Sequence, residues 1–133
     1  MDKVGRTPLL WAAFLGREAV VKQLISTNKV DLDAKDNGGQ TPLSWAAGNG
    51  HKEVVEQLIA TNRVNLDSKD NCGRTPLSWA AGYGQEEVVK QLIATNHVDL
   101  DSKDNRGRTP LSSASRPEYA STMGIGGWQL FLT

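Results

Sequence analysis

Apolar residues recur along the chain in short groups with helical spacing, separated by polar stretches. In HKEVVEQLIA, residues 51–60, the apolar positions stand at i, i+1, i+4 and i+5, which places them on one side of a helix. The same spacing recurs in VVKQLI at residues 20–25 and 88–93. Each stretch is therefore predicted to be an amphipathic helix with one apolar stripe.

A shorter helix is predicted before each of these stripes. Thr41 is a favoured N-cap residue, and Pro42 suits the first helical turn, where its missing N–H costs nothing. The small apolar residues of 43–47 then allow a neighbouring helix to come close. Gly50 is expected to end this helix in the left-handed conformation, and Asn62 is expected to end the following helix in the same way.

The two-helix pattern is one unit of an internal repeat. The pair Thr-Pro begins at residues 7, 41, 75 and 109, so every step is 34 residues. The units are nearly identical from one step to the next. The predicted organisation is repeat 1 at 2–35, repeat 2 at 36–69, repeat 3 at 70–103, a partial fourth repeat at 104–116 and a non-repeat tail at 117–133.

A single unit cannot bury its own apolar stripe. Burying a Val, Leu or Ile side chain fully contributes roughly 1.5–3 kcal/mol, and that gain needs a second unit stacked on the first. The repeat therefore predicts an elongated stack in which each unit contacts its neighbours.

The fourth unit stops after TPLSSAS at residues 109–115, and the tail lacks the second-helix stripe. We therefore expect the chain to be a fragment, or a mis-joined reading frame, of a longer array. A genuine disordered tail over 117–133 is the alternative and stays open.

These units resemble the ankyrin repeat, whose pattern is Thr-Pro-Leu-His-x-Ala followed by a glycine and a Val-Val-x-x-Leu-Leu core. The chain shows TPLLWAAFLG at 7–16, TPLSWAAGNG at 41–50 and TPLSWAAGYG at 75–84. The resemblance implies an all-α solenoid of stacked helix-turn-helix units, with extended loops and β-turn tips. The chain departs from the pattern at the histidine, which is Leu or Ser here. Since that histidine helps to tie neighbouring repeats in the family, a weaker tie is expected.

The resemblance also implies where a partner protein binds. In the family, partners contact the loop tips and the exposed side of the first helix, and positions that vary between units are free to carry specificity. Arginine and tyrosine are favoured residues in binding hot spots. The predicted partner-binding residues are Arg6, Phe14, Leu15, Gln40, Asn49, Arg74, Tyr83, Arg106 and Arg108.

The same tips carry acidic residues, which are expected to weaken any preference for an acidic partner. These residues are Asp2, Asp36, Asp70 and Asp104.

Composition narrows the class of partner. Lys plus Arg and Asp plus Glu both number 15, so the net charge is zero, which argues against a nucleic-acid or anionic-membrane binder. No apolar run is long enough to cross a bilayer, and no signal peptide is visible. The single cysteine, Cys72, fits an intracellular protein. The expected location is cytoplasmic, with the nucleus left open.

Two features of the sequence invite a chemical interpretation and are better explained by structure. The acidic stretch VDLDAKDNGG at 30–39 lacks the ligand spacing of a calcium loop. His51, His97 and Cys72 occupy positions that hold unrelated residues in the other units, as solvent-exposed positions do. No catalytic site, metal, cofactor or small-molecule substrate is therefore predicted.

Trp11, Trp45 and Trp79 occupy one position of the repeat. A ligand-binding ladder is one interpretation. Packing of each ring against the adjacent unit, as part of the core, is the preferred one.

The predicted function is a non-catalytic protein–protein interaction module that binds another protein. The alternatives are a targeting segment of a larger enzyme or signalling protein whose catalytic domain lies elsewhere, or a non-functional remnant.

Overall fold

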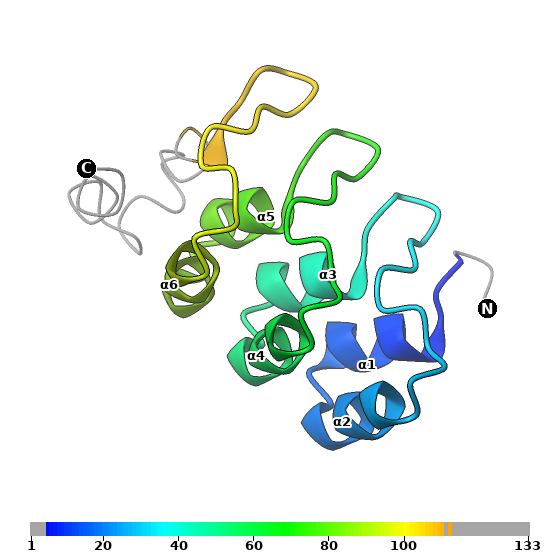
Figure 1. The fold of residues 1–133 in the computed structure, drawn as a ribbon. Helices are drawn as coiled ribbons and strands as arrows, with labels where there is room; N and C mark the ends of the chain where they lie inside the picture. The colour runs from blue at the N-terminus through cyan, green and yellow to red at the C-terminus, as the bar shows by residue number, and fades with distance from the viewer. Residues whose placement is uncertain (1–4, 111, 113–133) are drawn as a thin grey trace.

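The computed structural model describes residues 5–110 and 112, and in that part of the chain it contains α-helices and no strand. The helices come in pairs along the chain (Figure 1). They are α1 (Pro8–Leu15), α2 (Glu18–Ser26), α3 (Pro42–Gly48), α4 (Lys52–Ala60), α5 (Pro76–Gly82) and α6 (Glu86–Ala94).

The residues predicted to begin and end the helices do so. The Oγ1 of Thr41 accepts a hydrogen bond of 3.2 Å from the backbone N–H of Ser44, in the manner of an N-cap. Gly50 has a φ of 73° and Asn62 a φ of 56°, so both adopt the expected left-handed conformation. The second helix of repeat 2 begins at Lys52, one residue later than predicted.

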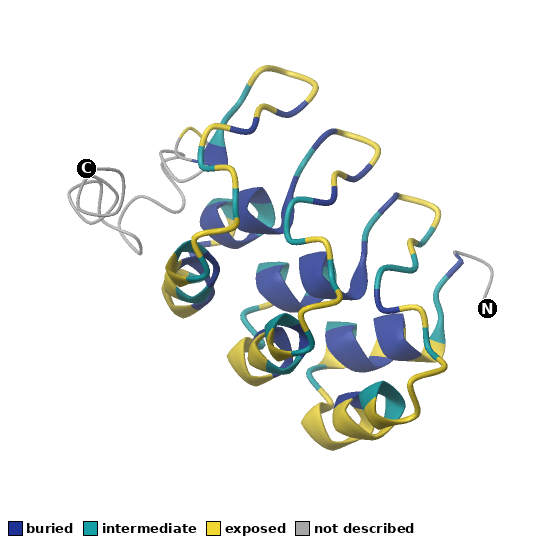
Figure 2. Cartoon of the chain, viewed as in Figure 1, coloured by how far each residue is buried: buried dark blue, intermediate teal, exposed yellow. Residues whose placement is uncertain are grey.

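The helices form two layers (Figure 1). α1, α3 and α5 lie side by side in one layer, and α2, α4 and α6 form the other. The loops stand out from the stack beyond the first helix of each pair, and their tips are exposed (Figure 2). The all-α stacked architecture predicted from the repeat is confirmed.

The core lies between the layers and between neighbouring pairs. Val54, Val55 and Leu58, from the predicted stripe of α4, are fully buried, and they pack with leucines and alanines of the first helices. Small alanines at the inner face of α3 let α1 and α5 approach closely on its two sides. Figure 2 shows the buried side of each helix facing its neighbours.

Polar ties cross from one pair to the next. The Nε2–H of His51 donates to the carbonyl oxygen of Phe14 over 2.9 Å, and the Nε2 amide of Gln85 donates to the carbonyl oxygen of Gly48 over 3.1 Å. The expectation that His51 varies because it is solvent-exposed is therefore wrong, since its ring is half-buried at a repeat junction. His97 and Cys72 are exposed as expected.

The loops form a second ladder of ties. The side-chain amide of Asn71 donates to the carbonyl oxygen of Asn37 over 2.9 Å, and that of Asn105 donates to the carbonyl oxygen of Asn71 over 3.0 Å. Because Asn recurs once per repeat, each loop is held at a fixed place relative to the next. The predicted tail at 117–133, and part of the predicted fourth unit, lie outside the described residues.

Candidate functional site

Five aromatic side chains form a continuous row along the first helices. The ring centroids of Trp11 and Phe14 lie 5.9 Å apart, and those of Phe14 and Trp45 lie 4.9 Å apart, both edge to face. The rings of Trp45 and Trp79 stack at 6.5 Å, and those of Trp79 and Tyr83 stack at 5.5 Å. We call these five residues the aromatic row. Contacts of this kind are favourable beyond the area they bury.

The aromatic row is on the surface rather than in the core. Trp11 is 38% exposed and Tyr83 is 50% exposed, while Trp45 and Trp79 are half-buried. The prediction that the tryptophans belong to the core is therefore wrong, although their packing across repeats is real. The sequence contains a signal for this exposure. The inward positions of each first helix hold Leu and Ala, and the Trp position lies on the opposite side of the helix.

In repeats 2 and 3, an aspartate of the loop holds the tryptophan of the same repeat. The Oδ1 of Asp70 accepts hydrogen bonds from the backbone N–H of Cys72 and Arg74, both at 2.9 Å. Its Oδ2 accepts one from the indole Nε1–H of Trp79 at 3.0 Å and one from the Nε of Arg74 at 3.2 Å. Asp70 as a whole is only 7% exposed, and its side chain only 1%. It therefore fixes the turn, the arginine and the ring together.

Asp104 makes the same bonds to its loop and its arginine one unit later, although the sequence has a serine there at the tryptophan position. Burial alone would raise the pKa of its carboxyl. Hydrogen bonds from the backbone N–H of Arg108 and Arg106, and from the Arg108 guanidinium, outweigh burial and hold the pKa below its ordinary value. The Nε of Arg108 lies 2.8 Å from the carboxylate Oδ2. Asp70 and Asp104, two of the acidic residues expected to weaken a preference for an acidic partner, are thus bound to an arginine and backbone N–H groups of their own loops.

Two arginines lie over the aromatic row. The guanidinium carbon of Arg74 is 4.1 Å from the ring centroid of Trp79. That of Arg6 is 4.8 Å from the centroid of Trp11 and 5.4 Å from that of Trp45. A guanidinium within about 6 Å of a ring centroid is attracted by the ring face. The row therefore combines aromatic rings with guanidinium groups.

A slot opens between the rings of Trp45 and Trp79. Its volume is about 120 Å³. Gly48 is one wall, and the absence of a side chain there leaves the space open, since a Cβ would lie 3.6 Å from the Trp79 ring. The residues that line the slot are Gln40, Ser44, Trp45, Gly48, Asn49, Trp79 and Tyr83.

The predicted partner-binding residues all lie at least partly at the surface. Arg6, Phe14, Arg74 and Tyr83 belong to the aromatic row or lie against it.

Two more of them, Gln40 and Asn49, line the slot. Arg106 is at the exposed tip of the last described loop, and Arg108 is tied to Asp104 below it. Leu15 is 50% exposed and is not part of the aromatic row. The prediction missed the three tryptophans of the aromatic row, of which Trp45 and Trp79 also line the slot.

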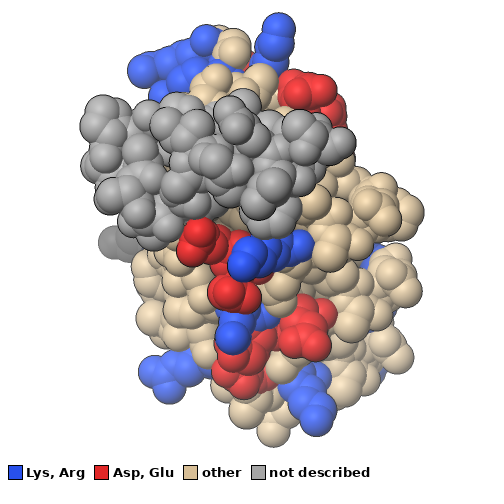
Figure 3. All heavy atoms as spheres, turned by 90° about the vertical axis from the view of Figure 1, so that its left-hand side faces the viewer, with Lys and Arg blue, Asp and Glu red and all other residues tan. Residues whose placement is uncertain are grey.

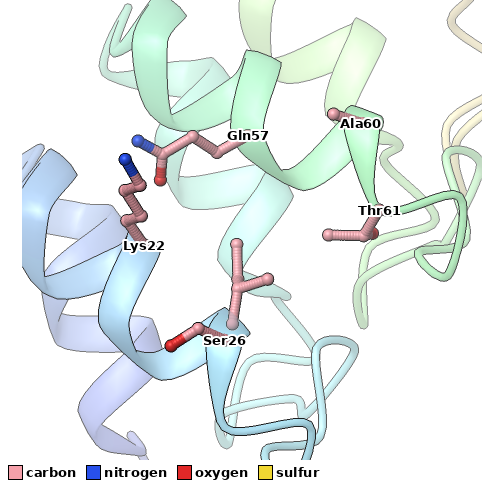
Figure 4. A pocket seen from close by; sticks show the side chains of 6 residues that line it. Lys22, Ser26, Gln57, Ala60 and Thr61 are labelled. Atoms are coloured by element: carbon pink, nitrogen blue, oxygen red, sulfur yellow. The ribbon is translucent and has the colours of Figure 1, made fainter.

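A wider hollow of about 520 Å³ lies on the opposite layer, between α2 and α4 (Figure 4). Lys22 and Gln57 point toward one another across it, and Ser26, Ala60 and Thr61 complete the labelled lining. A similar hollow of about 440 Å³ recurs between α4 and α6. Its recurrence at both junctions marks it as the furrow that stacked helices leave between them.

Charges of both signs are interspersed on the face shown in Figure 3. Among the described residues, no group of three or more His, Cys, Asp or Glu side chains is placed to hold a metal ion. In the same part of the chain, no helix has the length and apolar character needed to cross a membrane.

The family model described as ankyrin repeats (3 copies) matches residues 1–70 and again residues 56–122. The chain belongs to the ankyrin-repeat family. Ankyrin repeats are generally protein–protein interaction modules, and ankyrin-repeat domains are typically non-catalytic. No curated protein matches the sequence.

This ankyrin array departs from its family at the histidine of the first helix. Ser44 stands there in repeat 2, and its Oγ lies 3.2 Å from the Oγ1 of Thr41 in the same repeat. The serine therefore supports its own helix start. Ties between repeats come from other residues, among them His51 and Gln85 at the start of the second helices and the asparagines of the loops.

Proposed function

We propose that this chain is a non-catalytic protein-binding module and that its partner docks on the aromatic row and the loop residues beside it. The observation that carries the proposal is the row itself. It brings exposed and half-buried tryptophan, tyrosine and arginine side chains together on one continuous surface. Those residue types dominate binding energy at protein interfaces.

The row is also held in place before any partner arrives. The indole N–H of Trp45 donates to the Oδ2 of Asp36 at 2.9 Å, and Trp79 makes the same bond to Asp70. A ring that is already fixed loses little conformational freedom on binding, so more of its contact energy appears as affinity. The fixed orientation of the rings therefore supports a role in binding a partner.

The charge distribution supports a protein partner. Arg74 and Arg108 are each paired with an aspartate of their own repeat, so their charges are locally compensated. A nucleic-acid surface would present uncompensated cations to the phosphates. A partner with mixed polar and apolar side chains matches this surface better.

A random-peptide display library, selected against the purified chain, tests the proposal. Peptides that bind are then measured against Tyr83→Ala, which removes an exposed ring from the row. Lys52→Ala and Lys90→Ala, at exposed positions of the second helices, serve as controls. We expect Tyr83→Ala to weaken binding about tenfold or more, as removal of a hot-spot tyrosine does. Binding that is lost in the controls and kept in Tyr83→Ala would place the interface on the other layer and refute the proposal.

A further inference from the structure

The residue before each Thr-Pro pair is arginine in three units and glutamine in one. Arg74 pairs with Asp70, and Arg108 pairs with Asp104, in each case four residues apart. Gln40 stands at this position in repeat 2, four residues after Asp36. Repeat 2, which lines one side of the slot, therefore lacks the guanidinium that its neighbours carry.

Asp36 differs from its two counterparts for this reason. Its Oδ1 accepts the backbone N–H of Gly38 and of Gln40, and its Oδ2 accepts the indole N–H of Trp45. Among the described residues, no cation forms an ion pair with it. The Gln40 side-chain amide is directed away, toward the Oδ2 of Asp70 at 3.5 Å. Asp36 is half-buried, whereas its counterparts are buried. One acceptor position that an arginine fills in the next repeat is therefore open at Asp36.

The neighbouring repeats show how a guanidinium lies at the equivalent place. Arg74 lies over the ring of Trp79, and Arg6 lies over the ring of Trp11. In repeat 2, the corresponding ring is that of Trp45, which forms one wall of the slot. The wall opposite is Trp79. Arg6 lies 5.4 Å from the centroid of Trp45 and Arg74 lies 4.1 Å from that of Trp79, so the two rings of the slot already take part in cation–π contacts, and repeat 2 is the unit that contributes no guanidinium to them.

No side chain equivalent to Phe14 fills the slot. In repeat 1, Phe14 lies between Trp11 and Trp45, but Gly48 occupies the equivalent position of repeat 2. The remaining volume of about 120 Å³ is roughly four times the share of one water molecule in the liquid. A flat side-chain group fits there, with neutral polar groups of Gln40, Ser44 and Tyr83 among its lining.

We propose that the slot between Trp45 and Trp79 binds an arginine side chain of the partner protein, with its guanidinium stacked on the indole faces and paired with the Asp36 carboxylate. The inference rests on the proposed protein-binding function and specifies the chemistry of its central subsite. Arginine fits better than lysine because its planar group stacks on a ring face and still directs N–H donors to a carboxylate. The chain makes the same arrangement internally with Trp79, Arg74 and Asp70.

The probe is the peptide Ac-Gly-Ser-Arg-Ser-Gly-NH2, titrated into the full-length chain and followed by the indole Nε1–H resonances in ¹H–¹⁵N spectra. Three matched peptides replace arginine with citrulline, lysine or phenylalanine. We expect saturable shifts of the Trp45 and Trp79 indoles with the arginine peptide, at a dissociation constant on the order of millimolar for so small a ligand. Citrulline keeps the shape and loses the charge, so we expect about fivefold weaker binding with it.

The variant Gln40→Arg supplies the missing guanidinium from within the chain. It should fold at least as stably as the wild type, because it completes the pairing seen at Asp70 and Asp104. It should also abolish the shifts caused by the arginine peptide. Gln23→Arg adds the same charge at an exposed position of α2 and is the matched control, which we expect to bind as the wild type does.

Three results would overturn the inference. They are tighter binding of the phenylalanine peptide, which would make the slot an apolar subsite; equal binding of the citrulline peptide; and unchanged binding by Gln40→Arg. An absence of saturable shifts of the two indoles at tens of millimolar peptide would overturn it as well. Display-selected peptides that depend on Tyr83 but need no arginine would refute this inference alone and leave the proposed function standing.

Discussion

The indole N–H of Trp79 donates a 3.0 Å hydrogen bond to the Oδ2 of Asp70, nine residues earlier in the chain. The pair joins the loop of a repeat to the exposed side of its first helix. Trp45 and Asp36 make the same contact at 2.9 Å. Since both residues recur every 34 positions, the repeat builds a row of oriented rings along with its core.

The first prediction concerns Asp70. Replacing it with alanine removes a buried acceptor from two backbone N–H groups, an indole and a guanidinium. We expect Asp70→Ala to lower the free energy of unfolding by about 2–4 kcal/mol, because those donors lose their partner. Urea unfolding followed by circular dichroism measures the change. Asp101→Ala, at an exposed position, should alter stability little, and equal losses in the two variants would contradict this account.

The second prediction concerns acid stability. The pKa of Asp104 is lowered in the folded protein, so its charged form favours folding above the unfolded pKa of about 3.9. That contribution is lost as pH falls through the lower, folded pKa. We expect the stability difference between wild type and Asp104→Asn to be constant above about pH 5 and to shrink below about pH 4. Urea midpoints measured from pH 2 to pH 7 provide the test. A difference that grows on acidification would mean that the sign is wrong.

The third prediction contrasts two glycines. Gly48 is helical, and an added Cβ would make ordinary contact with Trp79 at 3.6 Å. Gly48→Ala should therefore stabilise the protein by about 0.5–1 kcal/mol. Gly50 has a φ of 73°, and a Cβ there would lie 2.4 Å from the Oε1 of Gln85.

Gly50→Ala should accordingly destabilise the protein by about 1–2 kcal/mol, since the left-handed conformation is costly for residues with a side chain. Thermal melts of both variants compare the two directly. Opposite signs are expected. A loss of stability in both would show that the slot has no room beside Gly48.

The fourth prediction tests the ties between repeats. Gln85 donates to the carbonyl oxygen of Gly48 in the preceding repeat, while Arg17 occupies the same repeat position at an exposed site in repeat 1. We expect Gln85→Ala to cost about 1 kcal/mol, the usual net contribution of one such hydrogen bond. Arg17→Ala should cost close to nothing. Similar values from chemical denaturation would show that the hydrogen bond contributes no net stability.

Much of the fold followed from local sequence rules. Thr41 and Pro42 mark a helix start, Asn62 marks a helix end, and the stripe around Val54 marks a buried face, because each of these depends on a residue and its near neighbours. The 34-residue period then implied stacking. Local rules of this kind carry over to the structure because every repeat obeys them equally.

The surface was harder to predict because it depends on contacts between distant residues. The sequence predicts that each tryptophan packs against the adjacent unit as part of the core, but Asp36 and Asp70 hold two of the rings at the surface through their indole N–H groups. Likewise, nothing local to Gln40 indicates that it lines a slot beside Trp79, 39 residues later. Such a site becomes visible only when two repeats are stacked.

The most direct test of the protein-binding role is to map the bound face of the full-length chain by NMR, with the tightest peptide from the display selection. The account predicts that the largest shifts fall on the indole resonances of Trp11, Trp45 and Trp79 and on the backbone of α1, α3 and α5. Shifts confined to α2, α4 and α6, with the three indoles unmoved, would contradict it and place the interface on the opposite layer.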